Sequence, residues 1–195
     1  MIPGDKSISQ RALIISLASI GKTIIEGILD SEDVYHTLKA IKQLGAKVKK
    51  SHGLIEVKGI GLGNLISPKQ PIYMGNSGTG TRLLLGLVAG SNALVTFFGD
   101  KSLTDRPMDR IISPLEEMGA TIISSKHKRL PITIIGARAK GFVLPINYKL
   151  LVPSAQVKSA ILLAALSARG TSFITDYRKT RNYTEIMLKK RGVSL

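Results

Sequence analysis

Glycine, small polar and basic residues gather at the start of three apolar stretches, where they could bind an anion. The first stretch reads GDKSISQR from Gly4, the second GNSGTGTR from Gly75, and the third SAQVKS from Ser154. The N-terminus of a helix offers unpaired backbone N–H groups and a partial positive charge, and glycine lets a ligand approach that backbone closely. The chemistry that these stretches indicate is the binding of phosphate or carboxylate groups.

Side chains within the stretches add charge and hydrogen-bonding groups. The candidates are Lys6, Ser7, Arg11, Asn76, Gly78, Thr79, Gly80, Arg82, Ser154, Gln156 and Lys158, with Arg106 of DRPMDR in a fourth position. The segment GNSGTGTR lacks the Gly-Lys-Ser/Thr ending of a P-loop and does not match the dinucleotide pattern G-x-G-x-x-G. Each stretch alone is typical of a helix cap or a glycine turn, so an anion site is favoured only because the stretches recur.

The recurrence has a period of about 74 residues. Helix-like segments end at Gly45, Gly119 and Gly192, which are 74 and 73 residues apart. Each period reads as helix, strand, helix and hairpin, and a further strand, PIYM or FVLPI, leads into the next period. The predicted βαβαββ units cover approximately residues 4–72, 73–146 and 147–195. The third unit stops before its closing hairpin.

Capping signals mark several of the expected helix starts. Ser7 with Gln10, and Asn182 with Glu185, have the spacing of a capping box. Pro107 suits the first turn of a helix, where its missing N–H costs nothing. We therefore expect helices to begin near these residues.

Composition is that of a folded, basic protein. The chain has 195 residues, of which 44% are hydrophobic and 21% are charged, which argues against wholesale disorder and allows one or two compact units. Its 28 Lys and Arg residues exceed its 13 Asp and Glu residues, and the formal net charge of +15 favours anionic partners. Nucleic acid, anionic lipid and phosphorylated metabolites all meet that condition.

Several classes of site are excluded or disfavoured. Cysteine is absent, which rules out disulfides, thiolate metal sites and cysteine nucleophiles. His36, His52 and His127 are scattered and are interpreted as surface residues rather than metal ligands. No run of 18 apolar residues is present and the N-terminus lacks the layout of a signal peptide. We expect a soluble protein of the cytoplasm with no membrane partner.

Basic residues also crowd the C-terminal stretch, where nucleic acid is a possible partner. They are Arg178, Lys179, Arg181, Lys189, Lys190 and Arg191. A solvated helix face is the usual explanation for such a run, and nucleic-acid binding favours aromatic platforms, whereas only 5% of the residues are aromatic. A basic, non-catalytic binding module for nucleic acid or a protein partner is therefore the alternative hypothesis.

Four motifs together are specific enough to indicate a family. In this order, PGDKSISQRAL, GNSGTGTRLL, DRPMDRIISPLEEMGA and VPSAQVKSAILLAAL closely resemble the N-terminal half of the EPSP synthase (3-phosphoshikimate 1-carboxyvinyltransferase) family. The leucine after the arginine of GNSGTGTRLL is similar to the class II bacterial branch. The sister transferase that acts on UDP-N-acetylglucosamine shares the repeat fold but begins with a different lysine motif, so it ranks behind.

The resemblance implies a fold and a reaction. The fold is a mixed α/β domain, an inside-out α/β barrel of βαβαββ repeats, in which residues 1–195 form one domain with an incomplete third repeat. The reaction moves the enolpyruvyl group of phosphoenolpyruvate to the 5-hydroxyl of shikimate 3-phosphate and releases phosphate, on the route to chorismate and the aromatic amino acids. The family uses no metal and no organic cofactor.

The resemblance also implies that part of the site is supplied elsewhere. Family members are about twice as long, and the second half carries the proposed acid and base groups and further cations that bind phosphoenolpyruvate. This chain is therefore expected to be a shortened, split or decayed form of the enzyme, inactive alone, for which a separate chain could supply the second domain. No catalytic residue is assigned within it, and no nucleic-acid partner is expected.

Substrate-binding residues are carried over by motif. Those implied for shikimate 3-phosphate are Lys6, Ser7, Arg11, Ser154, Ala155, Gln156 and Arg181. Those implied for phosphoenolpyruvate are Lys6, Gly78, Arg106 and Gln156, and Gly78 also leaves the space that the herbicide glyphosate shares. One departure concerns Arg181, because residues 180–185 read TRNYTE where the class II pattern reads TRDHTE.

Overall fold

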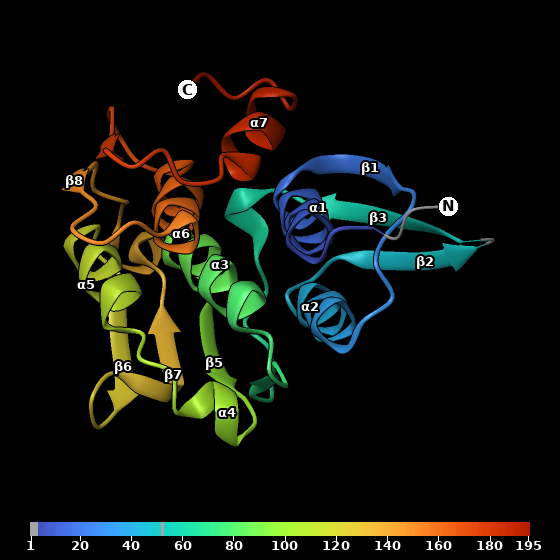
Figure 1. Cartoon of the computed structure of the whole chain (residues 1–195), viewed down its shortest axis with the longest axis horizontal. Coiled ribbons are helices and arrows are strands. Elements are labelled where there is room, and N and C mark those ends of the chain that lie inside the picture. The colour runs from blue at the N-terminus through green and yellow to red at the C-terminus, as the bar shows by residue number, and fades with distance from the viewer. Residues whose placement is uncertain (1–3, 52) are drawn as a thin grey trace.

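Three helices occupy the middle of the structure because their sequences are apolar on nearly every side. They are α1 (Lys6–Ala18), α3 (Gly78–Ala89) and α6 (Ala155–Ala165). In α3 every residue from Leu83 to Ala89 is buried, and a helix that is apolar all round must be covered on all faces. The computed structural model describes residues 4–51 and 53–195, and it shows these helices lying between outer sheets (Figure 1).

The remaining elements follow the predicted order. In the first period they are β1 (Ile20–Ile25), α2 (Glu32–Gln43), β2 (Lys47–Ser51), β3 (Leu54–Ile60) and the short 3-10 helix η1 (Leu62–Asn64). In the second they are β4 (Ile72–Tyr73), β5 (Leu94–Phe98), α4 (Lys101–Thr104), α5 (Asp109–Glu117), β6 (Thr121–Ser125), β7 (Arg129–Ile135) and η2 (Ala137–Lys140). In the third they are β8 (Asn147–Lys149), β9 (Phe173–Thr175) and α7 (Tyr183–Lys189). The predicted mixed α/β class is confirmed.

The sheets use one pairing scheme. β1 and β2 flank β3 in an antiparallel sheet, and β5 and β6 flank β7 in the same way, with β4 added parallel to β5. β8 pairs with β9 in parallel, as β4 does with β5. The strand after each central helix therefore occupies the same place in each period.

Close contact between α3 and α6 depends on a glycine. A Cβ atom at Gly86 would lie 2.2 Å from the carbonyl oxygen of Ala160, so any side chain there would push the two helices apart. The helices contribute large buried side chains such as Leu83, Leu84 and Ile161 to the core. Truncating one such leucine to alanine typically costs about 2–5 kcal/mol of stability.

Three local expectations are wrong. FVLPI does not form the strand that leads into the third period, because Pro145 has no N–H to donate, and the strand forms at β8 instead. Asp5, not Ser7, caps α1 by accepting the amide of Ile8 at 2.8 Å. Pro107 lies between α4 and α5 rather than in a first turn.

The second predicted capping box also fails to form. Asn182 is the N-cap residue of α7 but makes no side-chain capping bond, and Glu185 pairs with Lys158 instead. Glu185 binds Lys158 rather than a backbone N–H of the helix start because the lysine carries a full positive charge.

The histidines have different surroundings. His127 is exposed, as expected, whereas His36 is half-buried and packs edge-on against Tyr73 with ring centroids 5.2 Å apart. His52 lies outside the described residues. Within the described part of the chain, no group of three or more His, Asp or Glu residues is arranged to hold a metal, and no helix has the length and apolarity of a membrane span.

Candidate functional site

A polar pocket of about 500 Å³ opens where three helices begin. Its lining residues are Lys6, Asp33, Asn76, Gly78, Thr79, Arg106 and Gln156. α1 begins at Lys6, α3 at Gly78 and α6 one residue before Gln156, so the N-terminal ends of these helices meet at the pocket. The four residues carried over for phosphoenolpyruvate are spread between positions 6 and 156 of the chain, and the fold brings them together.

Lys6 is held at the pocket by an acidic residue. Its Nζ lies 2.8 Å from Oδ2 of Asp33, which is in the first turn of α2. The lysine side chain is half exposed, whereas that of Asp33 is 18% exposed. Asp33 was missed from the sequence because an acidic residue in a first helical turn is the common arrangement that favours the helix dipole.

Gly78 makes room for two guanidinium groups. A Cβ atom at this position would lie 2.8 Å from Nη1 of Arg106 and 3.0 Å from Nη1 of Arg82. Arg106 is oriented by bonds from its Nη2 to Oδ1 of Asn76 at 2.5 Å and to Oγ of Ser102 at 3.4 Å. Of Gly75, Gly78 and Gly80 in this stretch, only Gly78 lines the pocket.

The other two glycines serve packing. Gly75 has a φ of +56°, and a Cβ atom there would lie 2.5 Å from the ring of His36. A Cβ atom at Gly80 would lie 2.5 Å from Oγ1 of Thr37 and 2.6 Å from Oγ of Ser77. The glycine-rich stretch therefore shapes both the pocket and the contact of α3 with α2.

Gln156 is fixed at both ends of its amide. Its Oε1 accepts from Nη1 of Arg82 at 3.0 Å, and its Nε2 donates to Oγ1 of Thr79 at 2.8 Å. Arg82 also donates to the carbonyls of Gly78 at 3.4 Å and Pro107 at 3.3 Å. This arrangement leaves one N–H of Gln156 available to a ligand.

Positive charge accumulates behind the pocket. Burial lowers the pKa of Arg82, and the nearby charges of Arg106 and Arg110 lower it further. A bound anion would relieve this mutual repulsion, which is the electrostatic condition for preorganised binding of a phosphate. The sequence indicated Arg82 as a cation one turn into its helix but did not indicate that it holds Gln156.

Arg11 lies below the surface rather than at the pocket. Only 3% of it is exposed, and it donates to Oγ1 of Thr184 at 2.8 Å, to the carbonyl of Ser7 at 2.9 Å and to Oγ of Ser159 at 3.3 Å. Burial lowers its pKa, and the charge of the exposed Arg181 lowers it further. Arg11 thus links α1 to α6 and α7, with Arg181 close by.

The start of α6 is formed as predicted, but Lys158 is not at the pocket. Oγ of Ser154 accepts the amide of Val157 at 3.3 Å, and Ala155 opens the helix. Lys158 is only 7% exposed and is paired with Asp176 and Glu185, so it cannot serve as the cation behind an anion.

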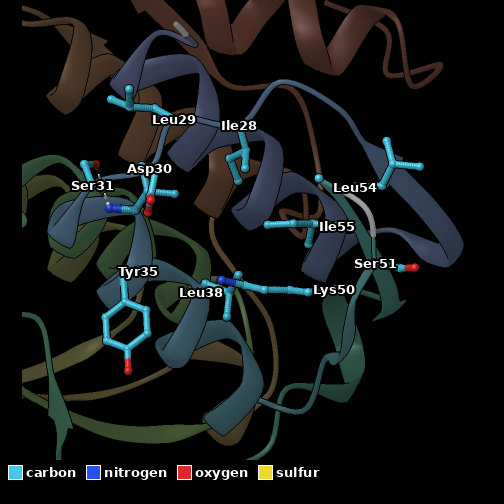
Figure 2. A pocket seen from close by; sticks show the side chains of 12 residues that line it. Ile28, Leu29, Asp30, Ser31, Tyr35, Leu38, Lys50, Ser51, Leu54 and Ile55 are labelled. Atoms are coloured by element: carbon cyan, nitrogen blue, oxygen red, sulfur yellow. Dashed lines mark hydrogen bonds between the residues drawn. The ribbon is translucent and has the colours of Figure 1, made fainter.

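A second hollow, of about 400 Å³, lies on another side of α2 (Figure 2). It is bounded by the loop before α2 and by the β2–β3 hairpin, with Leu38 and Ile55 among its apolar lining residues. None of the residues carried over from the family lines it.

Comparison with known proteins gives one consistent result. A sequence model described as EPSP synthase (3-phosphoshikimate 1-carboxyvinyltransferase) matches residues 1–195. The chain is 49% identical over 195 residues to the 3-phosphoshikimate 1-carboxyvinyltransferase of Parvibaculum lavamentivorans, covering 100% of this chain and 43% of that protein. It is 48% identical over 192 residues to that of Streptococcus uberis, covering 98% of this chain and 44% of that protein.

A solved structure agrees with these relatives. EPSP synthase from Acinetobacter baumannii superimposes with a TM-score of 0.93 at 38% identity, covering 100% of this chain and 43% of that one. The chain therefore spans less than half the length of the relatives that it matches.

Proposed function

Since the chain belongs to the EPSP synthase family, we propose that it forms the part of a 3-phosphoshikimate 1-carboxyvinyltransferase that holds shikimate 3-phosphate. In the proposed reaction, the enolpyruvyl group of phosphoenolpyruvate moves to the 5-hydroxyl of shikimate 3-phosphate with release of phosphate. The setting that we propose is the cytoplasm, as part of the shikimate pathway.

The observation that carries this proposal is the meeting of Lys6, Gly78, Arg106 and Gln156 in one polar pocket. Two anionic substrates repel one another, so a site for both requires fixed cations and N–H donors on several sides. Helix N-termini supply such donors without reorganisation. In our proposal, this pocket receives phosphoenolpyruvate.

Shikimate 3-phosphate would bind beside it. We propose contacts from Lys6, Ser7, Gln156 and the first turn of α6 at Ser154 and Ala155, and a phosphate contact from Arg181. Arg11 would lie below the bound substrate and contribute mainly through its positive charge, because three of its N–H groups already bind Thr184, Ser7 and Ser159.

Turnover would require groups beyond those in this pocket. Asp33 is the one carboxylate among the described lining residues, and it is paired with Lys6. General acid and base groups normally contribute about 10²- to 10⁴-fold each to a rate. We therefore propose that residues 1–195 alone bind substrate and that catalysis also needs the part of the relatives' length that they do not cover.

The test is titration of the purified chain with shikimate 3-phosphate by calorimetry, followed by a phosphate-release assay with phosphoenolpyruvate added. We expect saturable binding that Lys6→Ala weakens at least tenfold, and no detectable phosphate release. Lys47→Ala, at an exposed position on β2, is the matched control. Absence of binding, or turnover without a partner, contradicts the proposal.

Nucleic acid provides the second arm of this test. Tight binding of duplex DNA that falls steeply with salt, without any response to shikimate 3-phosphate, favours the basic binding module instead.

A further inference from the structure

Lys158 makes the most enclosed ion-pair cluster among the described residues. Its Nζ donates to Oε1 of Glu185 at 2.8 Å, to Oδ2 of Asp176 at 2.9 Å and to the carbonyl of Thr180 at 3.3 Å. The side chains of the lysine and Asp176 are 9% and 11% exposed. An ammonium group has three N–H donors, and here each has an acceptor.

The acceptors lie at both ends of one chain segment. Asp176 follows β9, and Glu185 lies in the first turn of α7. Oδ2 of Asp176 also accepts from the amide of Thr180 at 2.9 Å and from its hydroxyl at 2.6 Å. The amide, hydroxyl and carbonyl of Thr180 are therefore all tied to this cluster.

Arg181 follows Thr180 directly and is exposed. On its other side, Thr184 is buried and its Oγ1 lies 2.7 Å from Oγ of Ser159, the residue after Lys158. The backbone that carries Arg181 is thus attached on both sides to the first half of α6, whose first turn lies at the substrate pocket.

The cluster depends on Lys158 more than on any other member. Burial alone would lower the pKa of Lys158, but its bonds to Glu185 and Asp176 raise it, so the ammonium stays charged. Among the described residues, no donor reaches Oδ1 of Asp176 or Oε2 of Glu185, although both atoms are buried. Without the lysine, two carboxylates that are only 11% and 23% exposed would face one another with no direct cation, which is unfavourable.

We infer that Lys158 is a positioning residue: by fixing residues 176–185 to α6, it sets Arg181 at the place where the substrate phosphate binds. The ligand part of this inference rests on the proposed function, whereas the positioning of the segment does not. The substrate class that the positioned arginine suits is a phosphomonoester, because guanidinium groups bind phosphate in a bidentate manner.

The first experiment is hydrogen–deuterium exchange on the ligand-free chain, comparing Lys158→Met, Lys158→Arg and the exposed control Lys189→Met. We expect exchange of residues 177–183 to rise at least tenfold in Lys158→Met, to recover in part in Lys158→Arg, and to stay unchanged in the control. Exchange in α1 and α3 should not change. Unchanged exchange of residues 177–183 in Lys158→Met overturns the inference.

If Lys158→Met does not fold, Thr180→Val tests whether the cluster around Lys158 fixes residues 176–185. It removes only the hydroxyl bond to Asp176, and at least a threefold rise over the same segment is expected. No rise in a folded Thr180→Val chain likewise overturns the inference.

The second experiment is a double-mutant cycle on shikimate 3-phosphate affinity. When Arg181 is present, Lys158→Met should weaken binding about tenfold. In the Arg181→Ala background it should have no further effect, because both changes remove the same contact. Equal effects in both backgrounds contradict positioning through Arg181. If the unmutated chain binds no shikimate 3-phosphate, the proposed function fails, while the exchange result still decides the role of Lys158.

Discussion

Nη1 of Arg82 donates a hydrogen bond to Oε1 of Gln156 at 3.0 Å, although the two residues stand 74 positions apart in the chain. That separation equals one repeat period, so the contact joins helices that occupy matching places in consecutive units. It also fixes which end of the Gln156 amide faces the pocket, because the nitrogen at the other end donates to Thr79. The packing of matching helices from consecutive units thus orients the side chain of Gln156.

Replacing Arg82 by lysine should release Gln156. A lysine has no planar fork and cannot reach the acceptors at Gly78, Gln156 and Pro107 together. We expect the unfolding free energy, measured by urea denaturation, to fall by about 1–2 kcal/mol and phosphate affinity to fall several-fold. The exposed Arg110→Lys is the control, and an equal effect in both variants contradicts this role.

Gly78→Ala should narrow the pocket. The new Cβ would lie 2.8 Å from Nη1 of Arg106, so that guanidinium must move. On the proposed function, titrations followed by NMR should show glyphosate binding weakened more than phosphoenolpyruvate binding. Adding Arg106→Ala removes this contact and leaves only the 3.0 Å approach to Nη1 of Arg82, so the further effect of Gly78→Ala should become smaller in that background. A full effect there would show that Arg106 is not the cause.

Asp33→Asn should strengthen the binding of simple anions. The carboxylate now neutralises Lys6 at 2.8 Å and repels any anion in the pocket. Two unit charges about 4 Å apart interact by about 1 kcal/mol in water, which corresponds to roughly fivefold in affinity for inorganic phosphate. Asp30→Asn, on the exposed loop before α2, is the matched control. Weaker phosphate binding by Asp33→Asn would mean that orientation of Lys6 matters more than its charge.

Asp176 should make the fold sensitive to acid. Bonds from the Thr180 hydroxyl, then from Lys158 and the Thr180 amide, lower the pKa of Asp176 from 3.8 to about 2. A carboxyl group whose pKa is lower in the folded state stabilises the fold above its unfolded pKa, and this contribution is lost as the pH falls through the folded value. We therefore expect the unfolding free energy to decline between about pH 4 and pH 2.

Asp176→Asn should flatten that decline, because the titrating group is gone. Urea denaturation across this pH range measures it, with the exposed Glu26→Gln as control. An unchanged pH profile in Asp176→Asn would show that other carboxyl groups cause the loss.

The order of helices and strands was predicted correctly from the sequence pattern. The alternation of helix and strand, the 74-residue spacing of glycines and the apolar central helices are local, and the structure has them where the sequence indicated. The four residues predicted to bind phosphoenolpyruvate line one pocket, and their binding role stays a prediction. Errors arose where a side chain had a choice of partner. Gln10 was expected to cap α1, yet it is fully buried and donates to Ser77 at 2.5 Å, 67 residues away.

By itself, the sequence determined the family, the order of elements and the candidate residues at three helix starts, because these depend on local pattern and spacing. Only the tertiary structure decided which charges meet. Lys6 pairs with Asp33, Arg11 is buried against Thr184, and Lys158 faces two carboxylates rather than an anion. The physical reason is that the energy of a charge depends on burial and on neighbours from other periods of the chain, which no single segment specifies.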